Sequence, residues 1–477
     1  MLTVTDGLKD TGEAVLFAFD DHALPLHSGL QLQLHGHRTP CGRTRVVLSP
    51  GGANAPDSRA VVYYGSVCRV GAELWMYYLG QGDDAEWLQR VCLARSVDGR
   101  TWQRPELGLV PYRGSRRNNL VDLNQGRHHV QACVVLHDAD DPDPSRRFKM
   151  AFQCRHYRNR FAVAFSADGL VWSEAAGNPV GQHLEMAGGA RVGGTYVLCG
   201  QGGRHGPPPR QLITHLSVDF EHWSEGFCVG LQRAASATQR PWAGNDGRQV
   251  HLGAGLWHRG NVVVGFYGMW NGHASNDRRL VSMDLGLAIS SDGLHYREPV
   301  PDYPIVAAAE DGWAELPDLA ATTGAPALIQ GQGCENVGDE TLFWYAPWPE
   351  QRSDGVRLAT WPRDRLGSLR ALGAAGGHCV SAVIDAGAPA FRIWVNAEGL
   401  GPHTRVTAEV VDACYRPVAG YRRSDCLPVE TSGLRLPLRW ASGDVVVATQ
   451  PVRLRLDLTG IRPEDARLYA LYLEAVK

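Results

Sequence analysis

Four side chains capable of acid–base chemistry stand in similar short segments along this chain. Glu185 lies in "LEMAGGARV", Glu335 in "GCENVG", His129 in "GRHHVQAC" and His251 in "QVHLGAG". Two carboxyl groups near one bound sugar can cleave a glycosidic bond, because one protonates the leaving oxygen while the other attacks or activates water. Histidines can bond sugar hydroxyls or tune the pKa of the carboxyl groups. These residue types predict acid–base chemistry on a glycoside.

Three further residues accompany this set. Tyr64 occupies the equivalent place in "VVYYGSV", Asp57 is the nearest carboxylate before it, and Asn336 follows Glu335. We predict that Glu185, Glu335 and Asp57 are catalytic and that the substrate is bound by Tyr64, His129, His251 and Asn336. This hypothesis requires no cofactor. The alternative is a divalent metal, because imidazole and carboxylate groups also suit such an ion; its ligands would be His129, Glu185, His251 and Glu335.

Each candidate is expected on the first of several strands in a repeated unit. Segments such as "VVVGFYG" and "DLGLAIS" alternate apolar residues with others, as half-buried strands do. Four units then carry a short box, "SVDGRTW", "SADGLVW", "SVDFEHW" and "SSDGLHY". A fifth unit, with "TLFWYAP" and "GVRLATWPRD", lacks a clear box. Several strands per unit in five units predict a five-bladed β-propeller, whose radial repetition protects the sheet edges.

The box is expected to be structural. Its Ser and Asp can bond turn amides, its Gly accepts a positive φ, and its aromatic residue can fill the space between sheets. We therefore predict buried, equivalent places for Trp102, Trp172, Trp223 and Tyr296. Phe220 replaces the glycine in the third copy, so that turn is expected to differ.

The chain changes character after the fifth unit. Alternating segments such as "FRIWVNAEG" and "VRLRLDLTG" follow, without a helix-length amphipathic stretch, and predict a β-sandwich. The expected domains of this all-β chain are an irregular lead-in over residues 1–44, the propeller over 45–372 and the sandwich over 378–477.

Composition narrows the partners. A net charge of −3 gives no reason to expect nucleic acid or a membrane surface, and no apolar run is long enough for a membrane span. The start of the chain shows no basic segment followed by an apolar one, and the eleven cysteines follow no disulfide or zinc pattern. We therefore expect reduced thiols, a cytoplasmic location and a small-molecule sugar or glycoside as partner.

The blade motifs "DLGLAISSDGLHYREP", "ENVGDETLFWY" and "RLATWPRD" resemble those of glycosyl-hydrolase-like bacterial proteins. The expected architecture is similar to that of the invertase, levanase and fructanase hydrolases, and arabinanases and mannoside phosphorylases share the propeller. This resemblance implies a five-bladed propeller with inner-strand acids, and places Glu185 at the general acid/base position. The sequence departs from those hydrolases in blades one and two, where it offers Tyr64 and His128–His129 instead of aspartates.

Three classes of function follow. The first is a glycosidase or transglycosidase that acts on a small glycoside or a sugar-bearing metabolite. The second is a metal-dependent lyase or isomerase that uses the His/Glu set. The third is a carbohydrate-binding protein without catalysis.

Overall fold

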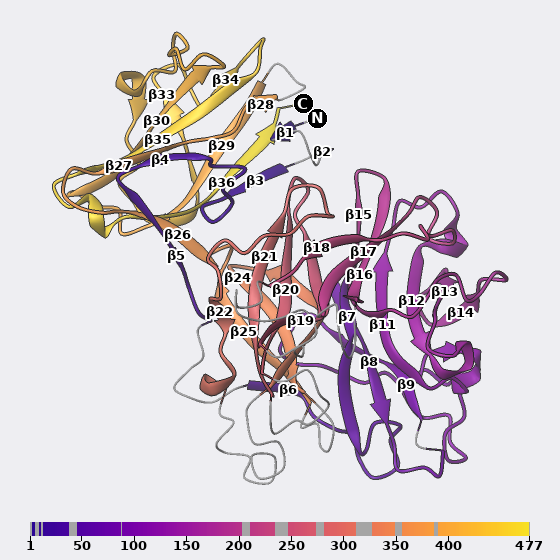
Figure 1. Ribbon diagram of the computed structural model, residues 1–477. Helices are drawn as coiled ribbons and strands as arrows, with labels where there is room; N and C mark the ends of the chain where they lie inside the picture. The colour runs from indigo at the N-terminus through magenta and orange to yellow at the C-terminus, as the bar shows by residue number, and fades with distance from the viewer. Residues whose placement is uncertain are drawn as a thin grey trace.

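The computed structural model describes residues 2–4, 9–10, 13–37, 45–86, 88–202, 210–233, 247–272, 281–311, 327–348, 355–385 and 390–476. These residues form β-strands in two lobes, together with six short 3-10 helices (Figure 1). The helices are η1 (Asn124–Gly126), η2 (Pro144–Arg146), η3 (Arg155–Tyr157), η5 (Ala308–Glu310), η7 (Arg423–Asp425) and η8 (Pro463–Asp465). The expected all-β class is confirmed. Within the described ranges, no helix has the length and apolar character needed to cross a membrane.

The larger lobe consists of five groups of antiparallel strands that follow one another along the chain. The first group contains β7 (Ala60–Val70), β8 (Glu73–Gln81) and β9 (Gln89–Ser96). The second contains β11 (Val130–His137), β12 (Phe148–Cys154), β13 (Phe161–Ser166) and β14 (Val171–Glu174), with β10 (Asp122–Leu123) parallel to β14. The third contains β15 (Glu185–Val192), β16 (Thr195–Gly202), β17 (Gln211–Ser217) and β18 (Cys228–Leu231).

The fourth and fifth groups complete this lobe. The fourth contains β19 (Gly247–His258), β20 (Val263–Gly272), β21 (Val281–Ser290) and β22 (Pro304–Val306). The fifth contains β23 (Leu328–Val337), β24 (Glu340–Pro347), β25 (Val356–Pro362) and, at its outer edge, β6 (Arg45–Leu48). A strand that precedes the first group in sequence therefore completes the last group.

The first strands of the five groups, β7, β11, β15, β19 and β23, form a closed ring. Each contacts the first strand of the next group, and β23 contacts β7. The contact from β23 to β7 is a parallel pairing of Gln332 with Ser66. The Ser66 hydroxyl accepts a hydrogen bond from Val135 N at 3.0 Å, and the Gln332 side chain accepts one from Gly189 N. We call the position along the ring axis at which Ser66, Val135, Gly189 and Gln332 lie the mid-ring level.

The first strands share one direction, which gives the ring two distinct sides. Gln330 Nε2 donates to the carbonyls of His251 and Gly253, and further along both strands Gly255 packs against Gly331. The start side is the side on which the first strands begin. The end side is the opposite side, where each first strand turns into the second strand of its group. The turns after β7, β15 and β23 are the shortest; in the turn after β7, Val70 pairs with Glu73.

All five first strands depart from regular pairing. Their register with the second strand shifts between Val62 and Ser66, Val130 and Ala132, Met186 and Gly188, His251 and Ala254, and Gln330 and Cys334. Such bulges bend a strand and redirect its side chains. Simple alternation along these strands consequently does not identify the side chains that face the ring axis.

The four boxes adopt one geometry. In each, Asp Oδ1 accepts hydrogen bonds from two backbone amides, as it does from Arg100 N and Thr101 N in the first box. The aromatic residue hydrogen-bonds back to the turn, as Trp102 Nε1 does to the Gly99 carbonyl at 3.1 Å. The expectation of a different third turn was wrong, because Phe220 adopts the same left-handed backbone, with φ 65°. Trp102, Trp172 and Tyr296 are buried as expected, whereas Trp223 is only half-buried.

The smaller lobe contains two seven-stranded sheets. One contains β2 (Lys9–Asp10), β1 (Leu2–Val4), β28 (Ile384–Asp385), β35 (Val452–Gly460), β27 (Gly377–Val380), β4 (Leu26–Ser28) and β30 (Thr404–Asp412). The other contains β32 (Gly433–Pro437), β29 (Ala390–Glu398), β36 (Arg467–Ala475), β26 (Gly367–Ala371), β5 (Leu30–Leu34), β3 (Glu13–Phe17) and β34 (Val445–Val447). A two-stranded pair, β31 (Cys426–Leu427) and β33 (Arg439–Trp440), accompanies them.

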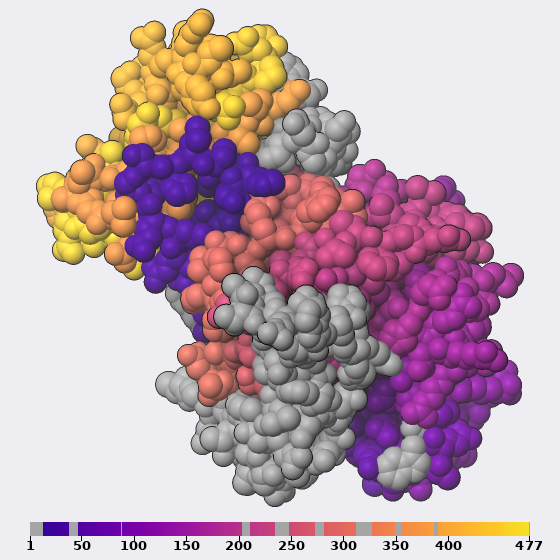
Figure 2. Space-filling model, in the orientation of Figure 1, coloured from indigo at the N-terminus to yellow at the C-terminus, as the bar shows by residue number. Residues whose placement is uncertain are grey.

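The N-terminal strands belong to this smaller lobe. In place of the irregular lead-in expected over residues 1–44, β3 pairs with β36 and β5 pairs with β26. Figure 2 shows these N-terminal residues, in indigo, on the smaller lobe beside the ring. Strand β26 also pairs with β36, although its residues fall inside the range expected for the propeller. The pairing partners lie at opposite ends of the sequence, so local patterns could not indicate this arrangement.

Candidate functional site

Glu185 is the first residue of β15 and lies at the start side of the ring, where it is partly buried. Gln201, its cross-strand neighbour, donates from Nε2 to Glu185 Oε2 at 3.2 Å. The carbonyl oxygen of the same side-chain amide, Gln201 Oε1, accepts a hydrogen bond from Leu252 N of β19 at 3.1 Å. Gln201 therefore connects the Glu185 carboxyl to the first strand of the next group and restricts its orientation.

His251 reaches the same side from β19. Its side chain is 5% exposed and packs against Trp270 and Trp348, with ring centroids 5.7 and 5.1 Å away. The bulge that follows places Leu252 at φ 58° and Gly253 at φ 75°. This turn directs the Leu252 amide towards Gln201, so the bulge connects His251 with the surroundings of Glu185.

His129 precedes β11, the first strand on the other side of β15. Its Nδ1 accepts a hydrogen bond from Gln89 N at 3.3 Å, so the proton of the neutral ring is on Nε2. Burial, followed by the positive charges of Arg155 and Arg90, lowers the pKa of His129 to about 4. His129 is therefore a neutral imidazole near pH 7, with an N–H that can donate to a ligand.

Tyr64 lies in the bulge of β7 and is half-buried. It packs against three apolar clusters, which contain Tyr63, Leu79 and Leu184 respectively. A residue that contacts three neighbouring clusters must lie towards the centre of the ring. Tyr64, His129, Glu185 and His251 accordingly come from four successive first strands or the residues immediately before them.

Asp57 does not join this set. It is completely buried, and its Oδ2 accepts hydrogen bonds from the Tyr78 hydroxyl at 2.7 Å and Arg104 Nε at 2.8 Å. Its carboxylate therefore holds Arg104 against Tyr78 of the first group. The sequence could not show this contact, because Arg104 lies beyond the whole first group.

Glu335 also lies apart from Glu185, contrary to the expectation from the sequence. Glu185 precedes the mid-ring residue Gly189 in β15, whereas Glu335 follows the mid-ring residue Gln332 in β23. At about 3.3 Å per residue, these offsets of four and three residues place the two glutamates about 20 Å apart along the strand direction. Glu335 forms an ion pair with Arg69, at 3.5 Å, on the end side.

The Asn336 side chain is held by neighbouring side chains, as that of Asp57 is. Its Nδ2 donates to Asp364 Oδ1 at 3.0 Å, and its Oδ1 accepts a hydrogen bond from the Thr341 hydroxyl at 2.7 Å. Asp364 is buried and is also bound by Arg259 and Tyr472. The predicted catalytic pair of Glu185 and Glu335, with Asn336 beside it, is therefore not brought together.

The metal hypothesis meets the same obstacle. Glu335 cannot share an ion with Glu185 from the opposite side of the ring. Across the described ranges, no three His, Cys, Asp or Glu side chains come together as a metal site would require. Of the residues predicted for the site, those that the described structure places on the start side are the carboxyl group of Glu185, the imidazoles of His129 and His251 and the phenol of Tyr64.

Side-chain amides are the functional candidates that the sequence did not reveal. Gln330, near the beginning of β23, is completely buried and occupies the place on the start side that Glu335 was expected to hold. It binds the carbonyls of His251 and Gly253 at 2.8 and 3.1 Å. Glutamine has no distinctive spacing in sequence, so only the position of "LIQGQG" at the start of a strand could have indicated it.

Comparison with known proteins gives matches to solved structures. No family model matches the sequence, and no curated protein matches it. A glycosyl hydrolase from Bacteroides ovatus is 14% identical, with a TM-score of 0.44 over 70% of this chain and 95% of its own. A thermostable family-43 glycoside hydrolase is 13% identical, with a TM-score of 0.40 over 66% of this chain and 92% of its own.

A third solved structure is an N-acetylgalactosamine deacetylase from F. plautii in complex with blood group B trisaccharide. It is 12% identical, with a TM-score of 0.43 over 71% of this chain and 97% of its own. Proteins of the glycoside-hydrolase type, suggested by the sequence motifs, are thus found among the structural matches.

Proposed function

We propose that this chain is a glycoside-processing enzyme that binds its sugar at the start side of the ring and uses Glu185 as general acid/base. The ring is, on this proposal, a five-bladed β-propeller, and the two seven-stranded sheets form a β-sandwich that includes the N-terminal strands. The observation that carries the proposal is the hydrogen-bonded sequence from Glu185 through Gln201 to Leu252. A general acid must be held in a defined orientation towards the leaving oxygen, and this contact provides it.

The neighbouring side chains fit recognition of a neutral hydroxylated substrate. His129 offers a neutral N–H donor, because its pKa lies near 4. Tyr64 can donate or accept through its hydroxyl, and an aromatic ring also offers an apolar face to a sugar ring. His251 lies beside Trp270 and Trp348. These residues are proposed to bind the substrate, and Glu185 to transfer the proton.

The reaction assigned to Glu185 is protonation of the glycosidic oxygen as its bond to the anomeric carbon breaks. An incoming water or sugar hydroxyl forms the new bond at that carbon and passes its proton to the Glu185 carboxylate left by the first transfer, which restores the carboxyl group. The attacking group is activated without Glu335, which lies at the opposite side, and without Asp57, which is bound to Arg104. Hydrolysis and transfer to a second sugar differ only in the nucleophile.

The test compares Glu185→Gln with Glu335→Gln on paired substrates. Aryl glycosides with a nitrophenyl leaving group need little protonation, whereas alkyl glycosides of the same sugar need it fully. We expect Glu185→Gln to reduce kcat on the alkyl glycoside by roughly 10²–10⁴-fold and on the nitrophenyl glycoside much less. Glu335→Gln is the matched control and should leave both rates essentially unchanged.

Equal losses on both substrates would remove Glu185 from proton transfer. Loss in Glu335→Gln with retention in Glu185→Gln would transfer the site to the end side. Sugar binding without turnover of any glycoside by the unaltered protein would contradict the enzyme proposal and favour a carbohydrate-binding protein.

A cytoplasmic location is also proposed. The cysteines of the described ranges are free thiols, several of them buried. Reduced thiols without a disulfide pattern are typical of a reducing compartment. Fractionation of source cells, followed by detection of the chain, tests this directly; recovery from the culture medium would contradict it.

A further inference from the structure

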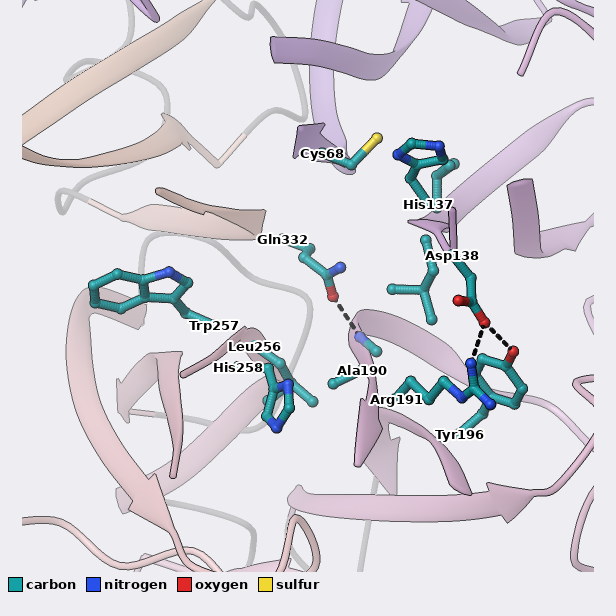
Figure 3. A pocket seen from close by; sticks show the side chains of 13 residues that line it. Cys68, His137, Asp138, Ala190, Arg191, Tyr196, Leu256, Trp257, His258 and Gln332 are labelled. Atoms are coloured by element: carbon teal, nitrogen blue, oxygen red, sulfur yellow. Dashed lines mark hydrogen bonds and ion pairs between the residues drawn. The ribbon is translucent and has the colours of Figure 1, made fainter. Parts of the chain in front are cut away.

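A cavity of about 280 Å³ opens at the end side of the ring, away from Glu185 (Figure 3). It is lined by residues from β7, β11, β15, β16, β19 and β23 or the turns that follow them. At its rim, Arg191 and His258 are exposed to solvent. The cavity is therefore open to small molecules and lies on the opposite side of the mid-ring level from the proposed active site.

Gln332 supplies a hydrogen-bond donor to this cavity. Its side chain is buried, with 7% exposure for the residue, and its Oε1 accepts a hydrogen bond from Gly189 N. Its Nε2 contacts no hydrogen-bond acceptor among the described residues, and in Figure 3 it faces the open space. This donor is reached from the cavity, so a ligand oxygen at this position would accept a hydrogen bond from Gln332 Nε2.

Asp138 supplies an acceptor on the facing wall. Its Oδ2 is bound by Arg191 Nη1 at 2.8 Å and by the Tyr196 hydroxyl at 2.6 Å. Its Oδ1 receives no hydrogen bond from the described residues and faces the cavity in Figure 3. A donor and an acceptor on opposite walls match hydroxyl groups, since each hydroxyl can both accept and donate.

The remaining lining favours a neutral ligand. The charge of Asp138 is balanced by Arg191, which pairs with it at 2.8 Å. Val135, Ala190 and Leu256 supply apolar surface. Burial, followed by the charge of Glu335, raises the pKa of the Cys68 thiol to about 12, so this group keeps its proton and is a poor metal ligand.

We propose that this cavity is a second binding site, separate from the Glu185 site, for a neutral hydroxylated ligand the size of one monosaccharide. Its volume is near the lower limit for small-molecule pockets, which suits a single sugar ring and excludes an oligosaccharide chain. Gln332 donates to one ligand oxygen and Asp138 accepts from a hydroxyl on the other side.

The experiment uses the full chain labelled with 5-fluorotryptophan, because Trp257 lines the cavity. The Trp257 fluorine resonance is assigned with Trp257→Phe and followed during titration with glucose, galactose, mannose, xylose and arabinose. We expect a saturable shift with at least one sugar. Gln332→Met should raise the apparent Kd about tenfold by removing one donor, and Ala190→Phe should abolish the shift by filling the cavity.

One control, a second test variant and a charged sugar make the result specific. Glu185→Gln should leave the Trp257 titration unchanged whatever it does to turnover, which separates this proposal from the proposed catalytic function. Arg191→Gln changes an exposed residue and provides a second test variant if Gln332→Met is unstable. It should weaken binding, because Asp138 loses the ion pair that orients its carboxylate. Glucuronate tests the charge of the ligand.

The proposal is overturned if no sugar shifts the Trp257 resonance. It is also overturned if folded Ala190→Phe binds as tightly as the unaltered protein, or if Arg191→Gln leaves the titration unchanged. Stronger binding of glucuronate than of glucose would contradict the neutral class. Loss of the shift in Glu185→Gln would assign the response to the start side.

Discussion

The serine and aspartate of each repeated turn act on backbone amides. Ser96 Oγ accepts a hydrogen bond from Gly99 N at 2.8 Å, and Asp98 Oδ1 accepts from Thr101 N at 2.7 Å. The same bonds recur around Ser166, Ser217 and Ser290. These aspartates are occupied by their own turns and are unsuited to catalysis, as their sequence pattern predicts.

Phe220 provides a test of backbone strain in these turns. It holds φ 65° where the other copies have glycine, and its ring packs on Phe165, Tyr196 and Trp223. Phe220→Ala loses this packing and keeps the strained backbone, at a cost of about 3–5 kcal/mol. Phe220→Gly loses the same packing but relieves strain of about 1 kcal/mol. We expect the glycine variant to be the more stable of the two in urea unfolding.

The reverse order would contradict this explanation. Gly99→Ala in the first box is a further comparison, since its added methyl group would lie 2.6 Å from Trp344. This variant should be destabilised both by the strained backbone and by the steric clash with Trp344.

The pKa of His129 predicts a dependence of stability on pH. Because the folded-state pKa is about 4, below the usual value for histidine, the unfolded chain binds this proton first as pH falls. The contribution of neutral His129 is complete above the unfolded pKa near 6.5 and decreases as pH falls towards about 4. We expect the Tm of the protein to fall over this interval and that of His129→Gln to fall less. Parallel Tm curves would show that His129 is not responsible.

Elements of the ring are joined by the box aromatics. Trp172 packs edge-on against Tyr77 of the first group, and the Tyr77 hydroxyl donates to the Gly169 carbonyl at 3.1 Å. In the same way Trp102 packs against Trp344 of the fifth group, and Trp223 against Phe161 of the second. Each of these boxes thus fastens its group to the preceding group of the ring.

Truncation of Trp172 should therefore weaken the ring and spare the start side. Trp172→Ala is expected to lower the free energy of unfolding by about 3–5 kcal/mol, as other large aromatic core truncations do. Trp223→Ala, at a half-buried position, should cost less. Unfolding in urea measures both, and turnover per folded molecule should remain nearly unchanged in each. Equal stability of Trp172→Ala and the unaltered protein would refute this role.

The sequence predicts the strands of the ring well and the orientation of their side chains poorly. Alternation and the boxes are local properties, so the five units and their turns can be recognised from the sequence. The bulges of the first strands are invisible to alternation, so the sequence could not show that Glu335 lies past the mid-ring level, near the end of β23. The contacts of Asp57 and Asn336 could not be predicted from the sequence, because Arg104 and Asp364, which bind them, are distant in sequence.

At the scale of the whole molecule, one apolar cluster and a buried polar contact join the two lobes. Phe17 and Tyr472 of the smaller lobe belong to the same buried cluster as Trp257 and Phe266 of the ring. Beside it, Asn261 binds both backbone groups of Val15, each at 2.8 Å. The lobes are therefore expected to unfold together.

Asp364 tests this coupling. Its buried carboxylate binds Arg259 of the ring and, at 2.8 Å, the Tyr472 hydroxyl of the smaller lobe. Asp364→Asn leaves the buried Arg259 without its counter-charge, which should cost about 3–5 kcal/mol. Glu106→Gln breaks an exposed pair with Arg117 and should leave the free energy of unfolding nearly unchanged. Calorimetry should show one transition for both variants, shifted far more in Asp364→Asn; two separate transitions in the unaltered protein would contradict the coupling.

The pairing of β3 with β36 has a consequence for biosynthesis. A ribosome produces β3 before the ring and β36 after it, so the early strand waits for its partner while the whole ring is being made. Strand β6 is likewise made early and must wait for β25 of the fifth group before it can pair. Contacts this distant in sequence form slowly, and the waiting edges are exposed to other nascent chains. A chaperone that covers extended apolar strands would be of most use to this protein at that stage of its synthesis.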